Sequence, residues 1–337
     1  MATISTTAAA GHNVVGRRAF VVAVGVWMVG ACVLAGWAPL GFSIVTVFVF
    51  AGPHNWMEAR YFMGKMPARW GKLKGYFLSA LVGVLVLTGW YAAFPWLAEL
   101  GGWSNETWLS GVALWNTAVI AWITGLILLR SRQNPRRNWS AAVPVSLVLV
   151  AAVWLWPNEW GLVLVYLHPC VAFWFLDLEL RHRHADWLVA YRCCVALVPV
   201  LLALLVWKLA SLPSLPGEDG LTLRITHHAG AGILPGVSSH LLVSLHTFLE
   251  MLHYGVWALT LPALTLTAVP WNLSQVPLAR RSPTWRVVLL CVLAVGLLAV
   301  LGFWAGFVAD YPLTRDIYFT VALIDVLAEI PFLLRQL

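Results

Sequence analysis

Long runs of apolar residues separated by short polar segments dominate the pattern of this chain. A helix rises about 1.5 Å per residue, so about 20 apolar residues cover the roughly 30 Å hydrocarbon core of a bilayer. The pattern therefore predicts an all-α fold, a polytopic transmembrane helix bundle of about ten spans. The predicted spans lie near 19–36, 38–53, 75–96, 108–129, 141–156, 159–176, 188–209, 238–262, 285–308 and 317–334.

The composition also excludes an ordinary soluble enzyme. Of the 337 residues, 61% are hydrophobic and 10% are charged, whereas soluble domains carry about 25% charged residues. The 21 Trp residues suit the aromatic belts at the two interfaces of a bilayer. The five Cys residues lie in apolar runs without a CxxC pair, so we expect neither a disulfide framework nor a cysteine metal site.

The basic residues predict the orientation of the spans. With the N-terminus inside, all but three of the 21 Lys and Arg residues fall on the cytoplasmic side, the exceptions being Lys208, Arg224 and Arg315. Basic residues concentrate in cytoplasmic loops, so we expect both termini in the cytoplasm and the protein in a bacterial inner (plasma) membrane. Residues 1–16 are expected to form a disordered tail, and residues 17–337 a single transmembrane helical domain.

The same charge distribution predicts the partners outside the bundle. The net charge of +7 comes from short loops rather than a solvated basic domain, so no nucleic-acid partner is expected. Segment 55–74 is basic and aromatic, and we expect it to lie along the cytoplasmic leaflet in contact with membrane lipids. The charged segment 177–186 is expected to be a solvated helix end. The oligomeric state stays open.

Ionisable residues at membrane depth are the candidates for function, since burying one in lipid costs at least about 2.5 kcal/mol. The first pair is His54 and Glu58, which follow Gly52-Pro53 at the end of the second run. In a helix, residues four apart share a face. The pair can bind one metal ion, the two side chains can hydrogen-bond each other, or they can serve with Arg60 as residues of the membrane interface.

The eighth run contains the strongest pattern, His246, Glu250 and His253. Helical periodicity places these three side chains on one stripe, and the Glu-x-x-His spacing is the one by which di-iron helix bundles present ligands. The stripe predicts a metal or redox centre, a proton or ion path, or a structural network. On the first interpretation, Glu250→Gln and His253→Ala should each lose bound metal, while His182→Ala should not.

Two further runs supply the remaining candidates. Asp325 and Glu329 are four apart in the last run, where two carboxylates repel each other unless a proton, metal or cation intervenes. His168 precedes Pro169 in the sixth run, and irregular backbone at membrane depth usually lines a cavity. His168 can equally be hydrogen-bonded to a neighbouring helix.

Phe50-Ala51-Gly52-Pro53-His54, followed by Glu58, resembles the Gly-x-Pro-His-x-x-x-Asp signature of the Brp/Blh family of membrane-integral β-carotene dioxygenases. That resemblance implies an iron ligand at His54 and cleavage of a carotenoid. The present chain has Glu in place of the acidic Asp. It also has His246 with Glu250 where the family has a His-x-x-x-His pair.

These residues favour a membrane-integral, metal-dependent oxygenase or oxidoreductase with non-haem iron and a lipid-soluble substrate such as a carotenoid, isoprenoid or quinone. Glu250, Asp325 and Glu329 are the candidate catalytic acids, supporting the ligands or handling protons. Two alternatives remain, a haem- or quinone-binding electron-transfer subunit and a proton-coupled secondary transporter. The candidate metal ligands are His54, Glu58, His168, His246, Glu250 and His253.

Overall fold

The computed structural model describes residues 16–133, 139–217, 219–265, 273 and 276–336, and in this part of the chain it is 86% helical without strands. The predicted tail, apart from Gly16, lies outside the described residues. The helices are α1 (Arg17–Trp37), α2 (Pro39–Lys65), α3 (Lys74–Gly101), α4 (Asn105–Gln133), α5 (Ala142–Leu155), α6 (Pro157–Arg183), α7 (Leu188–Leu209), α8 (Gly220–His228), α9 (Ser239–Tyr254), α10 (Leu261–Thr265), α11 (Pro283–Ala309) and α12 (Tyr311–Gln336).

The prediction of an all-helical membrane protein is confirmed in outline. Seven helices of the described chain are long and apolar enough to cross a bilayer, namely α1, α3, α4, α6, α7, α11 and α12. Helix α5 has 14 residues, about 21 Å of helix, which is shorter than the hydrocarbon core. Helices α2 and α9 are not among the seven, and both carry ionisable candidates.

Helix α2 runs further than the apolar pattern predicts. It passes through Pro53 and ends at Lys65, twelve residues beyond the end of the predicted second span. Tyr61 and Phe62 are buried against α6 and α12. The prediction that segment 55–74 lies along the cytoplasmic leaflet is therefore wrong for residues 55–65, whose aromatic side chains pack inside the bundle.

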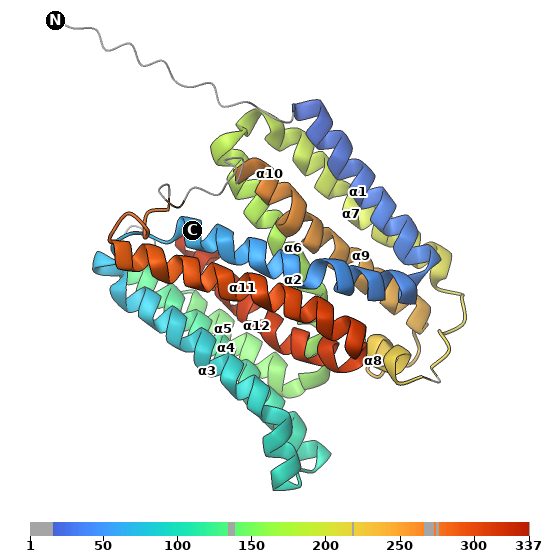
Figure 1. Cartoon of the computed structure of the whole chain (residues 1–337). Helices are drawn as coiled ribbons and strands as arrows, with labels where there is room; N and C mark the ends of the chain where they lie inside the picture. Colours follow the sequence, from blue (N-terminus) through green and yellow to red (C-terminus); the bar gives the residue numbers. More distant parts are fainter. Residues whose placement is uncertain (1–15, 134–138, 218, 266–272, 274–275, 337) are drawn as a thin grey trace, which may run out of the picture.

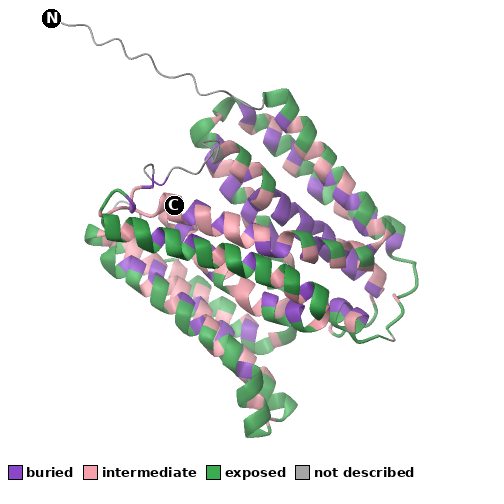
Figure 2. Cartoon of the chain, in the orientation of Figure 1, coloured by how far each residue is buried: buried purple, intermediate pink, exposed green. Residues whose placement is uncertain are grey.

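Helix α9 is the central helix of the bundle. Of its 16 residues, all but His240 and Leu245 are buried, and α1, α2, α6 and α7 pack around it. Figure 1 shows α9 between the α1–α7 pair and α2, and Figure 2 shows buried residues concentrated along it. Polar side chains on α9 consequently face other helices rather than lipid.

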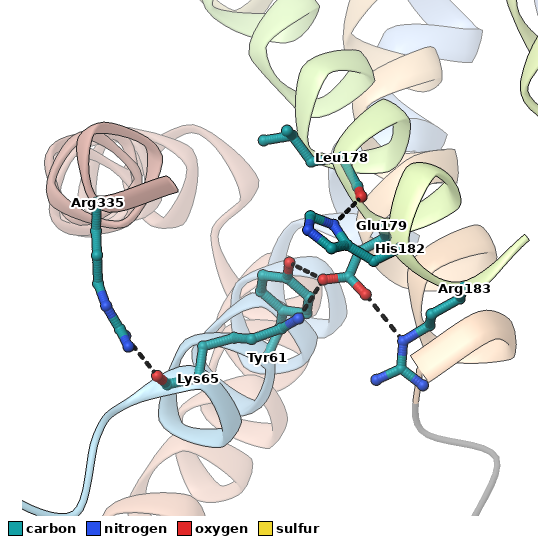
Figure 3. A network of polar contacts seen from close by, with 7 residues as sticks. All are labelled: Tyr61, Lys65, Leu178, Glu179, His182, Arg183 and Arg335. Atoms are coloured by element: carbon teal, nitrogen blue, oxygen red, sulfur yellow. Dashed lines mark hydrogen bonds and ion pairs between the residues drawn. The ribbon is translucent and has the colours of Figure 1, made fainter. Parts of the chain in front are cut away.

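The helix ends nearest the two termini lie at the same end of the bundle (Figure 1). Phe20 near the start of α1 and Phe332 near the end of α12 belong to one apolar cluster with Leu180 of α6. A polar network at this end connects α2, α6 and α12 (Figure 3). Arg335 donates from Nη1 to the carbonyl of Lys65 at 2.7 Å.

Glu179 is the centre of this network. Its side chain is only 4% exposed, and it accepts hydrogen bonds from Tyr61 Oη at 2.7 Å, from Arg183 Nε at 3.0 Å, and from the Lys65 ammonium. The prediction of a solvated helix end holds for the exposed His182 but is wrong for Glu179. The spacing of four residues on one helix indicates Arg183 as a partner of Glu179. Tyr61 and Lys65 lie on another helix, so local spacing does not indicate them.

Glu179→Gln should destabilise the protein by about 1–3 kcal/mol, because buried donors lose their charged acceptor. Asp177→Asn is the matched control, two residues earlier on α6. Asp177 also pairs with two arginines, Arg181 and Arg192, but both are about half exposed, so the loss should stay below about 1 kcal/mol. Unfolding in mixed micelles measures both values, and equal losses would contradict the central role of Glu179.

Candidate metal centre

Four helices bring five of the predicted residues together in the interior. His54 and Glu58 come from α2, His168 from α6, His253 from α9 and Glu329 from α12. They form two overlapping groups, His54–Glu58–His253 and His168–His253–Glu329, and within each group the ligand atoms lie within 4.8 Å of one another. His253 belongs to both groups. We call these five residues the metal-centre residues.

On α2, the helix continues through Pro53 and places His54 and Glu58 one turn apart, both buried. His54 Nδ1 lies 3.0 Å from the carbonyl oxygen of Phe50. A ring that donates from Nδ1 presents its other nitrogen, Nε2, as an unprotonated ligand. The carbonyl thus fixes both the tautomer and the orientation that a metal ion requires.

Gly52 allows α2 to approach α11 closely beside His54. A Cβ added at Gly52 would lie 3.2 Å from Cα of Val300 and 3.1 Å from its Cγ1. Small residues at such crossings let helix backbones come together in membranes. The glycine of the Gly-Pro-His sequence is therefore explained by packing, independently of any ligand.

Gly52→Ala should destabilise the protein by about 1–3 kcal/mol through overpacking and weaken metal binding by displacing His54. Gly41→Ala is the control on the same helix, because a Cβ there meets nothing within 4 Å. That control should be neutral or stabilising by up to about 1 kcal/mol. Unfolding in micelles measures both, and a neutral Gly52→Ala would contradict the tight crossing.

His253 and His168 face each other across α9 and α6, with ring centroids 4.7 Å apart. His54 also packs against His253, at 5.5 Å between centroids. His168 Nδ1 lies 3.4 Å from Glu329 Oε2. Three imidazoles and two carboxylates therefore form two neighbouring groups that share His253.

A π-helical segment, Gly255–Thr260, follows α9 directly. Such segments inside helices are frequent at functional sites. Trp257 of this segment is 1% exposed and donates from Nε1 to Glu329 Oε1 at 3.1 Å, leaving Oε2 toward His168. The sequence pattern did not indicate Trp257, because its role depends on the local change in helical register.

Two ligand atoms in this cluster have no hydrogen-bond partner in the described chain although they are buried. These are Glu58 Oε1 and His253 Nδ1. Buried polar atoms are normally satisfied, and a metal ion would satisfy both. Two atoms bound to one ion at about 2.1 Å lie at most about 4.2 Å apart, and the candidate ligand atoms of each group lie no more than 4.8 Å apart, so any pair at the upper end of this range has to move closer to bind one ion. The residues fit a metal ion.

His246 and Glu250, predicted as ligands with His253, lie outside both groups of ligand atoms. Glu250 Oε1 accepts a hydrogen bond from Tyr254 Oη at 2.8 Å, and Tyr254 and Tyr318 share one at 2.9 Å. The predicted stripe on α9 is thus divided between two places. His253 faces α2, α6 and α12, whereas His246 and Glu250 face a separate polar cluster. We accordingly expect Glu250→Gln to retain metal, unlike the expectation from the stripe.

Asp325 and Glu329 also differ from the sequence-based interpretation. Glu329 lies among the ligand atoms rather than only supporting them. Asp325 belongs to neither group and is half-buried, but its charge and that of Glu329 both act on Glu58. Three acidic side chains without an ion pair to Lys or Arg among the described residues favour a bound cation.

No known protein family, curated protein or solved structure matches this chain.

Proposed function

We propose that the protein is a membrane-integral metalloenzyme, a non-haem iron oxygenase or related oxidoreductase that acts on a lipid-soluble substrate. The observation that carries the proposal is the convergence of His54, His168 and His253 with two carboxylates inside the bundle. Burying any one of these ionisable groups at membrane depth without a partner costs free energy. Convergence on one ion gives each of them a partner.

The donor set favours iron over softer metals. Imidazole and carboxylate oxygen suit iron, manganese or zinc, whereas thiolates select copper(I) and iron–sulfur clusters. Glu58 and Glu329 balance the charge of a divalent ion bound by neutral imidazoles. Iron held by imidazole and carboxylate with open coordination positions supplies the oxidation chemistry of non-haem oxygenases.

The surroundings of His168 support a substrate from the bilayer. Its side chain is 26% exposed, while the other four metal-centre residues are buried. On the same helix, Leu167 and Cys170 are exposed and apolar. A carotenoid, another isoprenoid or a quinone can reach His168 from this face without crossing water, and the resemblance of the Gly52–Glu58 segment to the Brp/Blh signature favours a carotenoid.

The topology is part of the proposal. With all ten apolar runs crossing the membrane, alternating directions place both termini on one side, in agreement with the shared end of α1 and α12 (Figure 1). The basic loops then assign that side to the cytoplasm. The membrane we propose is the bacterial inner membrane.

Haem is less well supported than a mononuclear iron. Two axial imidazoles must lie on opposite faces of a porphyrin, but His253 packs 4.7 Å from His168 and 5.5 Å from His54 between ring centroids. The macrocycle would also have to displace buried carboxylates. A proton-coupled transporter remains the second alternative because Glu58 and Glu329 are buried acids.

The test is dioxygen uptake by purified, iron-loaded protein given a panel of carotenoids, linear isoprenoids and quinones in micelles. We expect uptake with at least one class, lost in His253→Ala and retained in His182→Ala. A Soret band in the purified protein would identify haem instead. Ion-dependent solute uptake by proteoliposomes without metal would identify a transporter.

A further inference from the structure

A second buried polar cluster lies beside the metal centre, toward the end of the bundle occupied by α8. It contains Arg315 of α12, Glu250 and His246 of α9, and His228 of α8. Arg315 is 4% exposed, and His246 and Glu250 are each 7% exposed. We call these four residues the arginine cluster. The metal-centre chemistry does not require any of them.

Arg315 has no hydrogen bond or ion pair to any described residue, and its Nε is buried without a partner. Its guanidinium stacks on Phe319 at 4.5 Å from the ring centroid, and His228 stacks on the same ring at 4.4 Å between centroids. The neighbouring Asp316 pairs with Arg224 instead. A buried guanidinium left without an acceptor is costly, so an acceptor belongs beside it.

Glu250 presents the opposite deficiency. Its Oε1 is bound by Tyr254, but its Oε2 is buried without a partner. His246 Nδ1, at 3.9 Å from Oε2, is too far for a hydrogen bond. The charges of Glu250 and Arg315 act on each other, yet no ion pair joins them. His228 connects the two groups, because its ring stacks on Phe319 beside Arg315. The same ring lies 5.0 Å between centroids from the ring of His246, one helical turn from Glu250. An unmet donor and an unmet acceptor therefore belong to one cluster of contacting residues.

A hydroxyl group satisfies both at once, because it accepts from one neighbour and donates to another. We propose that the arginine cluster binds a hydroxyl group of the lipid-soluble substrate, with Arg315 donating to the hydroxyl oxygen and Glu250 Oε2 accepting its proton. This inference deepens the proposed function and rests on it, because the bound molecule is taken to be the substrate of the proposed enzyme. Among the substrates proposed above, this selects those that carry a hydroxyl group, namely a hydroxylated carotenoid, an isoprenoid alcohol or another long-chain alcohol, and not a bare hydrocarbon.

The position of the cluster relative to the metal centre is consistent with one ligand reaching both. His246 and His253 are separated by seven residues on α9, about 10 Å along the axis. A hydroxyl held beside His246 thus leaves the adjoining apolar chain within about 10 Å of the metal-centre residues. Apolar pockets with a few placed polar groups commonly orient ligands in this way.

The experiment measures binding without turnover. Radiolabelled hexadecan-1-ol is bound to the immobilised full-length protein in micelles, and unlabelled hexadecan-1-ol, hexadecane and hexadecanoate compete for it. We expect the alcohol to compete about tenfold better than the hydrocarbon, which corresponds to one or two net hydrogen bonds. The carboxylate should compete more weakly than the alcohol because Glu250 repels it.

Two variants test the assigned partners. Arg315→Met should abolish the preference for the alcohol over the hydrocarbon. Glu250→Gln should raise the competition by hexadecanoate at least about tenfold, because the repelling charge is removed while Arg315 remains. Arg224→Met, which removes an exposed arginine at the same end of the bundle, should change neither ratio. Glu250→Gln keeps the test possible if Arg315→Met does not fold.

The outcomes separate this proposal from the proposed function. Alcohol preference without bound metal would support the site and contradict the metalloenzyme. Equal competition by all three probes in the wild-type protein, unchanged by Glu250→Gln, would overturn the hydroxyl site and indicate that only water bridges Arg315 and Glu250.

Discussion

Replacing His253 should abolish metal binding more completely than any other single change. His253 contributes to both groups of ligand atoms, so its loss removes a ligand from each. Changes to residues that only support ligands cost about 10–100-fold in metal affinity, and we therefore expect His253→Ala to cost more than about 100-fold. Elemental analysis after dialysis against buffered iron measures the effect.

The controls for His253→Ala come from the same chain. His253→Gln keeps a polar side chain of similar size and should also lose metal, which separates ligand loss from misfolding. His182→Ala removes an exposed imidazole whose Nδ1 lies 2.6 Å from the carbonyl oxygen of Leu178, outside both groups of candidate ligand atoms, and should retain the metal. Full iron content in both His253 variants would show that the chain does not bind iron through His253 and would contradict the proposed metal centre.

Neutralising Glu58 should leave the metal-free protein stable but remove the stabilisation that bound metal gives. Glu58 is 1% exposed, one carboxylate oxygen has no partner, and the charges of Glu329 and Asp325 act on it. Glu58→Gln relieves this crowding of acids. The metal-free variant should therefore be at least as stable as the metal-free wild-type protein.

The same variant should lose stabilisation by metal. A ligand present at 100 times its dissociation constant stabilises a protein by about 2.7 kcal/mol, and this gain should nearly vanish in Glu58→Gln. Unfolding in micelles with and without iron measures both quantities. A metal-free variant destabilised by more than about 2 kcal/mol would instead indicate that Glu58 is a structural residue.

Helical periodicity explains why part of the centre is visible in the sequence. His54 with Glu58, and His246 with Glu250 and His253, are spaced so that each set faces one side of its helix. Their isolation in apolar runs identifies them as buried polar groups. The identity of the four contributing helices was therefore predictable, because each had to give its ionisable residue a partner.

The grouping of ligands was not predictable from that spacing. Which helices are neighbours depends on packing between segments far apart in the sequence, such as the close crossing of α2 and α11 at Gly52. The packing of the helices as a whole places His253 among the ligand atoms and Glu250 outside them, and it brings Glu329 to His168. The π-helical segment adds Trp257 as a donor to Glu329, and helical periodicity contains no signal for it.

The burial of Arg315 was also not predictable from the sequence. In the sequence it counts only as one of three basic residues outside the cytoplasmic loops, which suggests a residue in contact with water. The structure buries it on α12 beside Phe319, with no ion pair to an acidic side chain among the described residues. The contacts of α8 with α12, His228 with Phe319 and Arg224 with Asp316, cannot be inferred from hydropathy, because α8 is short and polar.

X-ray absorption spectroscopy of the iron-loaded, wild-type protein, combined with its metal content, tests whether these histidines and carboxylates bind iron. We predict about one iron per chain, bound by nitrogen and oxygen alone, with the multiple-scattering signal of imidazole rings that weakens in His54→Ala and His168→Ala. Sulfur in the coordination shell, or a chain that retains no metal after purification under iron-replete conditions, would contradict a metal centre built from these four helices.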